Sequence, residues 1–111
     1  MPTTADMYGS MTVLAVEPVL AGDESAAFRD RVSEQLDLGG RWFVIDFSKV
    51  AYCDSRGLEE LLDFQERVEV AGGFVKIAGL RGNCRRIFEL VRFDKRFDVF
   101  DSLQEAVKSL R

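Results

Sequence analysis

Histidine is absent from the 111 residues, and cysteine occurs only twice, as Cys53 and Cys84. Without histidine, the chain has no Ser-His-Asp or Cys-His catalytic group, and it lacks the commonest protein ligand of zinc. The two cysteines form no C-x-x-C pair, and each lies in an apolar pattern. We therefore expect ordinary buried thiols and no metal, while a redox or disulfide role stays open.

Long apolar segments are also missing: no run approaches the roughly 18 residues that a membrane-spanning helix requires. Residues 1–10 lack the basic and apolar regions of a signal peptide, so we expect a cytoplasmic protein. The formal net charge of −4 argues against a chain-wide basic surface for nucleic acid. Neither nucleotide-binding glycine motif is present, and a Cys-x5-Arg phosphatase loop would need arginine at position 59, which is Glu59.

Strand-like and helix-like patterns alternate along the chain. We expect strands at 11–16, 19–20, 42–47, 74–78 and 97–100, and helices at 23–38, 55–70, 83–91 and 103–110, with Asp23, Asn83 and Ser102 as helix N-caps. Residues 1–10 are expected to form a flexible N-terminus, and residues 92–96 a turn. This order predicts one α/β domain over 11–110, with a mixed, mostly parallel sheet of four to five strands and about four helices.

The most informative segment runs from residue 44 to residue 58. An apolar strand is followed by a short polar turn, and Asp54-Ser55-x-Gly57-Leu58 then opens an amphipathic helix. This order places the Ser55 hydroxyl at a helix N-terminus, on the rim where parallel strands end. Such a hydroxyl can be a helix cap, a nucleophile or a phosphorylation site. The missing histidine removes the triad nucleophile, and a single serine can serve as both cap and phosphorylation site.

Charged residues flank this motif and recur near the third expected helix. Glu59 and Glu60 are interpreted as a solvated acidic face near the positive end of the helix dipole. A basic cluster, which is either a solvated face or a docking surface for an acidic ligand, comprises Arg81, Arg85, Arg86, Arg92, Lys95 and Arg96.

The segment from Val44 to Leu58 resembles the signature of STAS domains, the anti-sigma factor antagonist family, and the resemblance extends over residues 11–110. It implies a STAS fold without a cofactor or an enzymatic activity of its own. It also implies regulation of transcription by partner switching: the unphosphorylated domain binds an anti-sigma factor that is a serine kinase. Phosphorylation of Ser55 then releases this partner, and a phosphatase resets the switch.

The resemblance assigns the partner-binding surface to Asp54, Ser55, Arg56, Gly57, Leu58 and Glu59. In it, Asp54 holds the motif and Gly57 lets the backbone of the partner approach closely. Arg56 stands where the family more often has a small residue, so its charge bears on the choice of partner. We expect a monomer or a weak dimer.

Two other functions remain open on the sequence. One is a non-switching STAS subunit of an ABC lipid-transport system, in which the same surface would dock permanently on the ATPase. The other is a STAS module that senses a small ligand or nucleotide. Its only support is the basic cluster.

Overall fold

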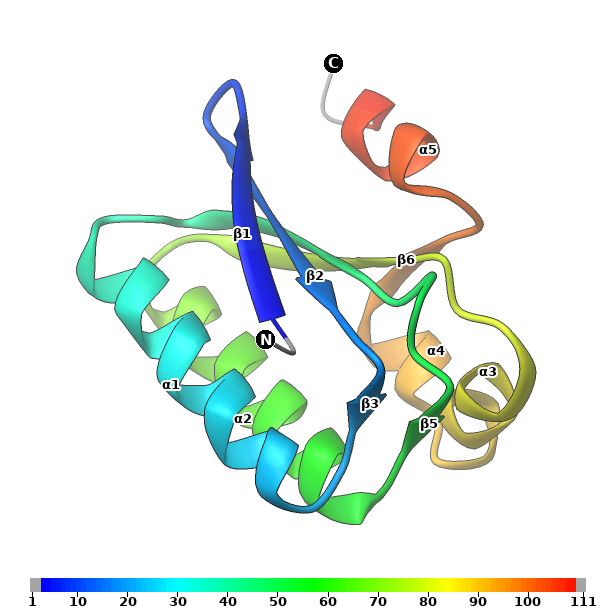
Figure 1. Ribbon diagram of the computed structural model, residues 1–111. Coiled ribbons are helices and arrows are strands. Elements are labelled where there is room, and N and C mark those ends of the chain that lie inside the picture. Colours follow the sequence, from blue (N-terminus) through cyan, green and yellow to red (C-terminus); the bar gives the residue numbers. More distant parts are fainter. Residues whose placement is uncertain (1–2, 110–111) are drawn as a thin grey trace.

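The computed structural model describes residues 3–109 and contains a five-stranded sheet of order β1-β2-β4-β6-β7 (Figure 1). β1 pairs antiparallel with β2, and every other neighbouring pair in this sheet is parallel. The strands are β1 Thr3–Tyr8, β2 Met11–Val16, β4 Trp42–Asp46, β6 Phe74–Ala78 and β7 Asp98–Phe100. Two shorter strands, β3 Val19–Leu20 and β5 Tyr52–Cys53, form a separate parallel pair. The predicted α/β class with a mixed, mostly parallel sheet is confirmed.

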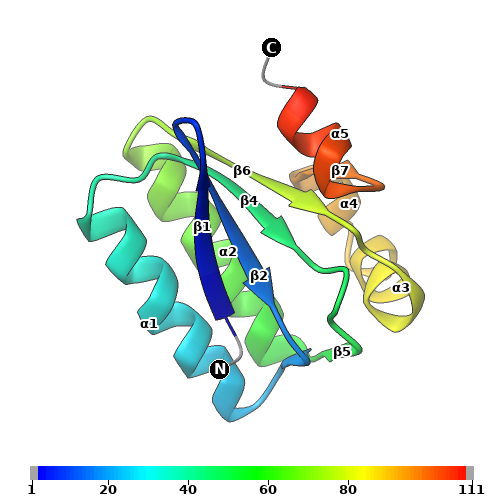
Figure 2. The same cartoon turned by 45° about the horizontal axis from the view of Figure 1, so that its top comes forward.

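The helices are distributed unequally over the sheet. They are α1 Asp23–Asp37, α2 Ser55–Val70, α3 Gly82–Leu90, α4 Phe93–Arg96 and α5 Leu103–Lys108. α1 and α2 lie side by side on one face, and the short α5 lies on the other (Figure 2). α4 occupies the segment that was expected to be a turn. It forms because Phe93 stacks edge-on against Phe88 at 5.6 Å and Phe97 packs beside it.

The continuous apolar character of β4 follows from burial on both faces. Phe43 and Ile45 belong to the large core under α1 and α2, together with Phe64 of α2. Val44 points the other way, into a smaller core with Ala106 of α5. The first residue of the strand, Trp42, is 42% exposed, so burial begins only at Phe43.

Residues 1–10 were expected to form a flexible end outside the domain. The structure instead places Thr3–Tyr8 in the strand β1. Its side chains carry little apolar signal. The strand is held instead by a six-residue antiparallel ladder to β2, with Ala5 packed against the core. The sequence pattern missed it because backbone pairing leaves no trace in residue type.

Two of the three predicted caps are wrong. Gly22 precedes α1 and Arg81 precedes α3, so Asp23 and Asn83 already lie inside their helices. Ser102 is confirmed, since its hydroxyl accepts a hydrogen bond from the Glu105 N–H at 3.2 Å. The expected extension of the last helix to residue 110 lies outside the described residues. Between residues 3 and 109, none of the helices combines the length and apolarity needed to cross a membrane.

Candidate functional site

The candidate site is the start of α2, which the β3–β5 pair holds in place. The Ala51 N–H bonds to the Pro18 carbonyl at 2.8 Å, and the Asp54 N–H bonds to the Leu20 carbonyl at 3.3 Å. These bonds frame the two residue pairs of the parallel register, Val19 with Tyr52 and Leu20 with Cys53. The chain therefore reaches α2 on a fixed path. β3 lies at the expected residues 19–20, whereas β5 was not expected from the sequence.

Asp54 is the N-cap of α2 and also joins α2 to the loop before α1. One carboxylate oxygen accepts the Gly57 N–H at 3.0 Å, and the other accepts the Gly22 N–H at 3.1 Å. The hydrogen bond from Gly57 is the main cause that lowers the pKa of Asp54. The Gly22 and Arg56 N–H groups and the Arg56 charge act in the same direction, against partial desolvation. Asp54 is therefore a carboxylate at neutral pH.

Ser55 is exposed at the first residue of α2. Asp54 fills the cap position, so the structure decides the alternative that the sequence left open: Ser55 is not the cap. Its hydroxyl lies beside the positive end of a 16-residue helix whose apolar face is anchored in the core. A group placed in this way is open to another protein's active site without any unfolding.

Gly57 and Leu58 are both buried in the domain, although the resemblance assigns them to the partner-binding surface. A Cβ built on Gly57 would come within 2.0 Å of the Leu20 carbonyl oxygen. The glycine thus lets α2 pack onto the backbone of β3 within this domain, and its expected role in a partner's approach stays a prediction. Leu58 is 7% exposed and contributes to the large core.

The charged residues after Ser55 differ in their exposure and in whether they bind another side chain of the domain. Arg56 and Glu59 are exposed, as a role in partner contact requires. Glu60 instead accepts a hydrogen bond from Arg29 of α1 at 3.2 Å, and its side chain is only 22% exposed. Glu60 therefore ties the two large helices together and is not part of a free acidic face.

The two cysteines, although 31 residues apart in sequence, meet beneath this site. Both are free and buried, Cys53 in β5 and Cys84 in α3. The hydrogen bond between the two thiols and their burial raise the pKa of Cys53 above its usual value. The expected burial of both thiols is confirmed, and the redox or disulfide role stays open.

A hollow of about 400 Å³ adjoins the site between the 48–51 loop and the start of α3. Asp46 shapes this loop by accepting the Ser48 N–H at 3.0 Å, and the Arg81 guanidinium donates to the Ser48 carbonyl. These bonds connect the end of β4 to the start of α3. β5, which contacts α3, then leads the chain to Ser55 at the start of α2.

The sequence analysis missed two residues at this site. Gly22 supplies an N–H to Asp54, and only the tertiary fold brings the two together. Tyr52 is 49% exposed on β5, where an aromatic residue at a strand position would ordinarily be assigned to the core. Its alternation with the buried Cys53 was the available signal.

Comparison with known proteins shows which family this fold belongs to. The family model for the STAS domain matches residues 4–106. BtrV of Bordetella bronchiseptica, described as an anti-sigma factor antagonist, is 23% identical over 111 residues, covering 100% of this chain and 96% of its own.

Three of the solved structures that share the fold illustrate the similarity. An anti-sigma factor antagonist from Mycobacterium paratuberculosis has a TM-score of 0.87 at 23% identity, covering 96% of this chain and 91% of its own. The unphosphorylated anti-sigma factor antagonist SpoIIAA has a TM-score of 0.78 at 17% identity, with coverage of 98% and 97%. SpoIIAA is also known in a phosphorylated form, with a TM-score of 0.77 at 16% identity and coverage of 98% and 99%. By its family match and its fold, this chain belongs to the STAS domain family.

Proposed function

We propose that this protein is an anti-sigma factor antagonist that acts in the cytoplasm and is switched by phosphorylation of Ser55. Its partner is an anti-sigma factor with serine kinase activity, and the protein performs no catalysis of its own. The observation that carries the proposal is the exposed Ser55 hydroxyl at the first residue of α2, with the cap already supplied by Asp54. The relatives described as anti-sigma factor antagonists support this assignment.

The chemistry of the switch follows from charge. A phosphoryl group adds about −1.5 to −2 charge at pH 7. The N-terminus of α2 tolerates this charge within the domain, but the group stands beside the Asp54 carboxylate on the exposed surface. A partner that covers Ser55 would have to bury both negative groups. A loss of about 3–4 kcal/mol of interface energy would weaken binding several hundredfold.

The test begins with the protein and its Ser55→Asp variant as paired baits in an extract of the native cells. The kinase that is recovered is purified, and we expect it to add one phosphoryl group from ATP to the wild-type protein and none to Ser55→Ala. Ser55→Ala should keep its affinity for the kinase, whereas Ser55→Asp should weaken it at least tenfold. Transfer that persists in Ser55→Ala would contradict the proposal.

The two other functions predict different results. A transport subunit would recover an ATPase and its permease with both baits equally. A ligand sensor would bind GTP, ATP or lipid in calorimetry.

A further inference from the structure

The structure divides the basic cluster into two groups with different roles. Arg85 approaches Glu89 at 3.8 Å and Asp101 at 3.6 Å, so it ties α3 to the chain that follows β7. Arg96 contacts Glu66 at 3.1 Å and exchanges hydrogen bonds with the buried Gln65 of α2. The guanidinium groups of these two arginines are thus occupied by contacts within the domain, which hold α3 and α4 in place.

The other basic residues are exposed and form no ion pair with another described residue, although the Arg81 guanidinium also donates to the Ser48 carbonyl. Arg81, Arg86, Arg92 and Lys95 are all exposed, and within residues 3–109 none has an acidic partner within 4 Å. Asp94 is the acidic residue beside them on α4. The chain as a whole carries a net charge of −4, so a cluster of unpaired cations is a local exception on an acidic protein.

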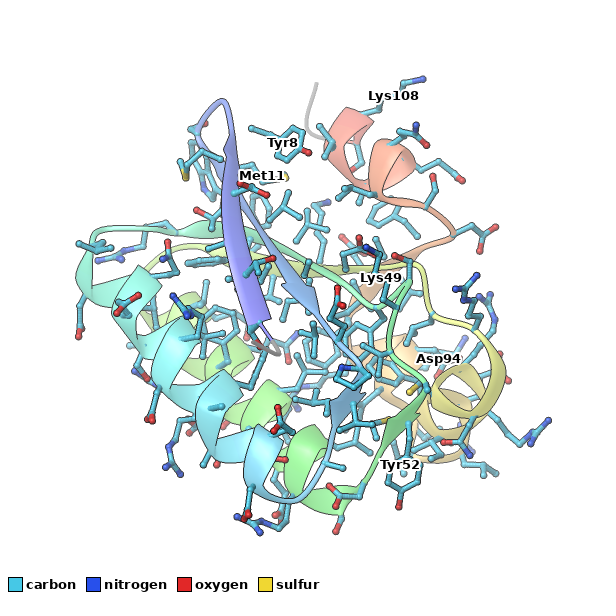
Figure 3. All side chains as sticks on the ribbon, viewed as in Figure 1. Tyr8, Met11, Lys49, Tyr52, Asp94 and Lys108 are labelled. Atoms are coloured by element: carbon cyan, nitrogen blue, oxygen red, sulfur yellow. The ribbon has the colours of Figure 1, made fainter. Side chains whose placement is uncertain are left out.

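Apolar side chains accompany these cations. Leu90 lies one helical turn after Arg86 on the same face of α3 and is 74% exposed. Tyr52 projects from β5, which packs against α3 (Figure 3). We call the surface formed by Tyr52, Arg81, Arg86 and Leu90 the α3 face. Its mixture of arginine and large apolar groups is typical of protein interfaces.

We propose that the α3 face binds an acidic, amphipathic segment of the protein that also meets Ser55. Charge complementarity identifies the occupant: carboxylates pair with Arg81 and Arg86, and apolar side chains cover Leu90 and Tyr52. The face reaches toward the phosphorylation site through β5, which contacts α3 and ends two residues before Ser55. The inference rests on the proposed function for the identity of the partner.

This surface explains how one modification can act over a wide interface. An acidic segment held by the α3 face approaches Ser55 from a positively charged side. A phosphoryl group on Ser55 adds negative charge next to the bound segment, and it also reduces the attraction of the arginines. Phosphorylation would therefore weaken contacts with α3 as well as contacts with the serine itself.

The test uses nuclear magnetic resonance of the full chain and two synthetic helical peptides. The first peptide has glutamate on one face and leucine on the other, and the second has lysine in place of every glutamate. We expect the acidic peptide to shift the amide signals of Tyr52 and residues 81–92, and the basic peptide to leave them unchanged. Absence of shifts, or shifts centred elsewhere, would overturn the proposal.

Variants make the test specific. Arg86→Glu and Leu90→Ser should each weaken the acidic peptide about tenfold, equivalent to about 1.4 kcal/mol. Lys108→Glu is the matched control, because Lys108 is an exposed cation on α5, far from Tyr52 (Figure 3), and should change the affinity less than twofold. Equal loss in Arg86→Glu and Lys108→Glu would indicate only general charge attraction and would contradict the α3 face. Unchanged circular dichroism would show that each variant is folded.

The two proposals can fail separately. Phosphorylated Ser55 with no peptide binding at α3 would refute the α3 face alone. Peptide binding at α3 in a protein that no kinase modifies would refute the proposed switch, and with it the claim that one partner meets both surfaces. The link itself requires Ser55→Asp to weaken the acidic peptide, and an unchanged affinity would overturn that link.

Discussion

The two ends of the sheet differ in the side chains that they expose and in the hydrogen bonds of their polar groups. Large apolar side chains are exposed at the amino rim, where β4 and β6 begin: Met7, Tyr8, Leu38, Trp42 and Val70. The carboxyl rim, where β4 and β6 end, carries fewer such groups and more organised polar contacts. Asp54 bridges two segments there, and Arg81 holds the 48–51 loop.

The rims nevertheless share one packing device. At the carboxyl rim, a Cβ on Gly57 would meet the Leu20 carbonyl oxygen at 2.0 Å, and at the amino rim, a Cβ on Gly73 would meet the Arg41 carbonyl oxygen at 1.9 Å. Close backbone approach therefore serves stability at both ends. What distinguishes the carboxyl rim is an exposed hydroxyl at the start of an anchored helix, and the predictions below test that difference.

The largest effect is expected from filling these two close approaches. Gly57→Ala and Gly73→Ala should each lower the free energy of unfolding by about 1–3 kcal/mol, because the backbone must move to admit a methyl group. Denaturant unfolding measures this loss. Only Gly57→Ala should also slow phosphorylation of Ser55 in the folded protein, since it displaces the start of α2. Equal slowing by both variants would erase the distinction between the rims.

Removing the cap at the carboxyl rim should have the next largest effect. Asp54→Ala should destabilise the protein by about 1 kcal/mol, and Asp54→Asn should cost less because asparagine is also a good cap. The measurement is denaturant unfolding at neutral pH. A different outcome is that Asp54→Asn lowers the free energy of unfolding as much as Asp54→Ala does. That result would show that the negative charge and the second carboxylate oxygen, which accepts the Gly22 N–H, contribute more than the cap.

The same residue predicts a pH dependence with a definite sign. The pKa of Asp54 is lower in the folded state than in the unfolded state, mainly because of the Gly57 hydrogen bond. Its contribution is therefore complete above the unfolded-state pKa of about 3.9 and is lost as the pH falls through the lower folded-state pKa. The stability difference between wild type and Asp54→Asn should shrink over that acidic range. A difference that grows on acidification would contradict the assignment.

Replacing the serine itself should scarcely change stability. Ser55→Ala should shift the free energy of unfolding by no more than about 0.5 kcal/mol, because the residue is exposed and Asp54 is the cap. Thermal unfolding is a sufficient measurement. A loss near 1 kcal/mol would show that the hydroxyl has a structural role after all.

The smallest effect is expected at the amino rim. Leu38→Gln and Val70→Gln remove apolar groups that are 76% and 89% exposed, so stability should again change by no more than about 0.5 kcal/mol. Neither variant should alter the rate at which Ser55 is phosphorylated. A slower rate would mean that the kinase reaches across to the amino rim.

Much of the fold could be predicted because a strong periodic pattern of apolar residues fits only one type of secondary structure. The apolar run of β4 and the amphipathic pattern of α2 were assigned almost to the residue. Predictions failed where backbone pairing or neighbouring side chains decide. β1 is held by its ladder to β2, and α4 forms because Phe93 and Phe97 meet Phe88.

The site divides in the same way. Residue types and order were enough to place Ser55 at the start of a helix on the rim of a parallel sheet. They could not show that Asp54 is the cap and Ser55 is free, since both are good capping residues. Nor could they show that Gly57 packs against Leu20, a contact between segments 37 residues apart.

The sequence by itself therefore determined the α/β class, the position of the Asp54-Ser55 motif and the absence of histidine-based catalysis. These follow from composition and short-range periodicity, which act along the chain. Tertiary structure alone decided which arginines are paired, which face of α3 is open, and that Gly22 joins Asp54. Such contacts join residues that are far apart in the sequence, and the distances between them are set only when the helices and strands pack together.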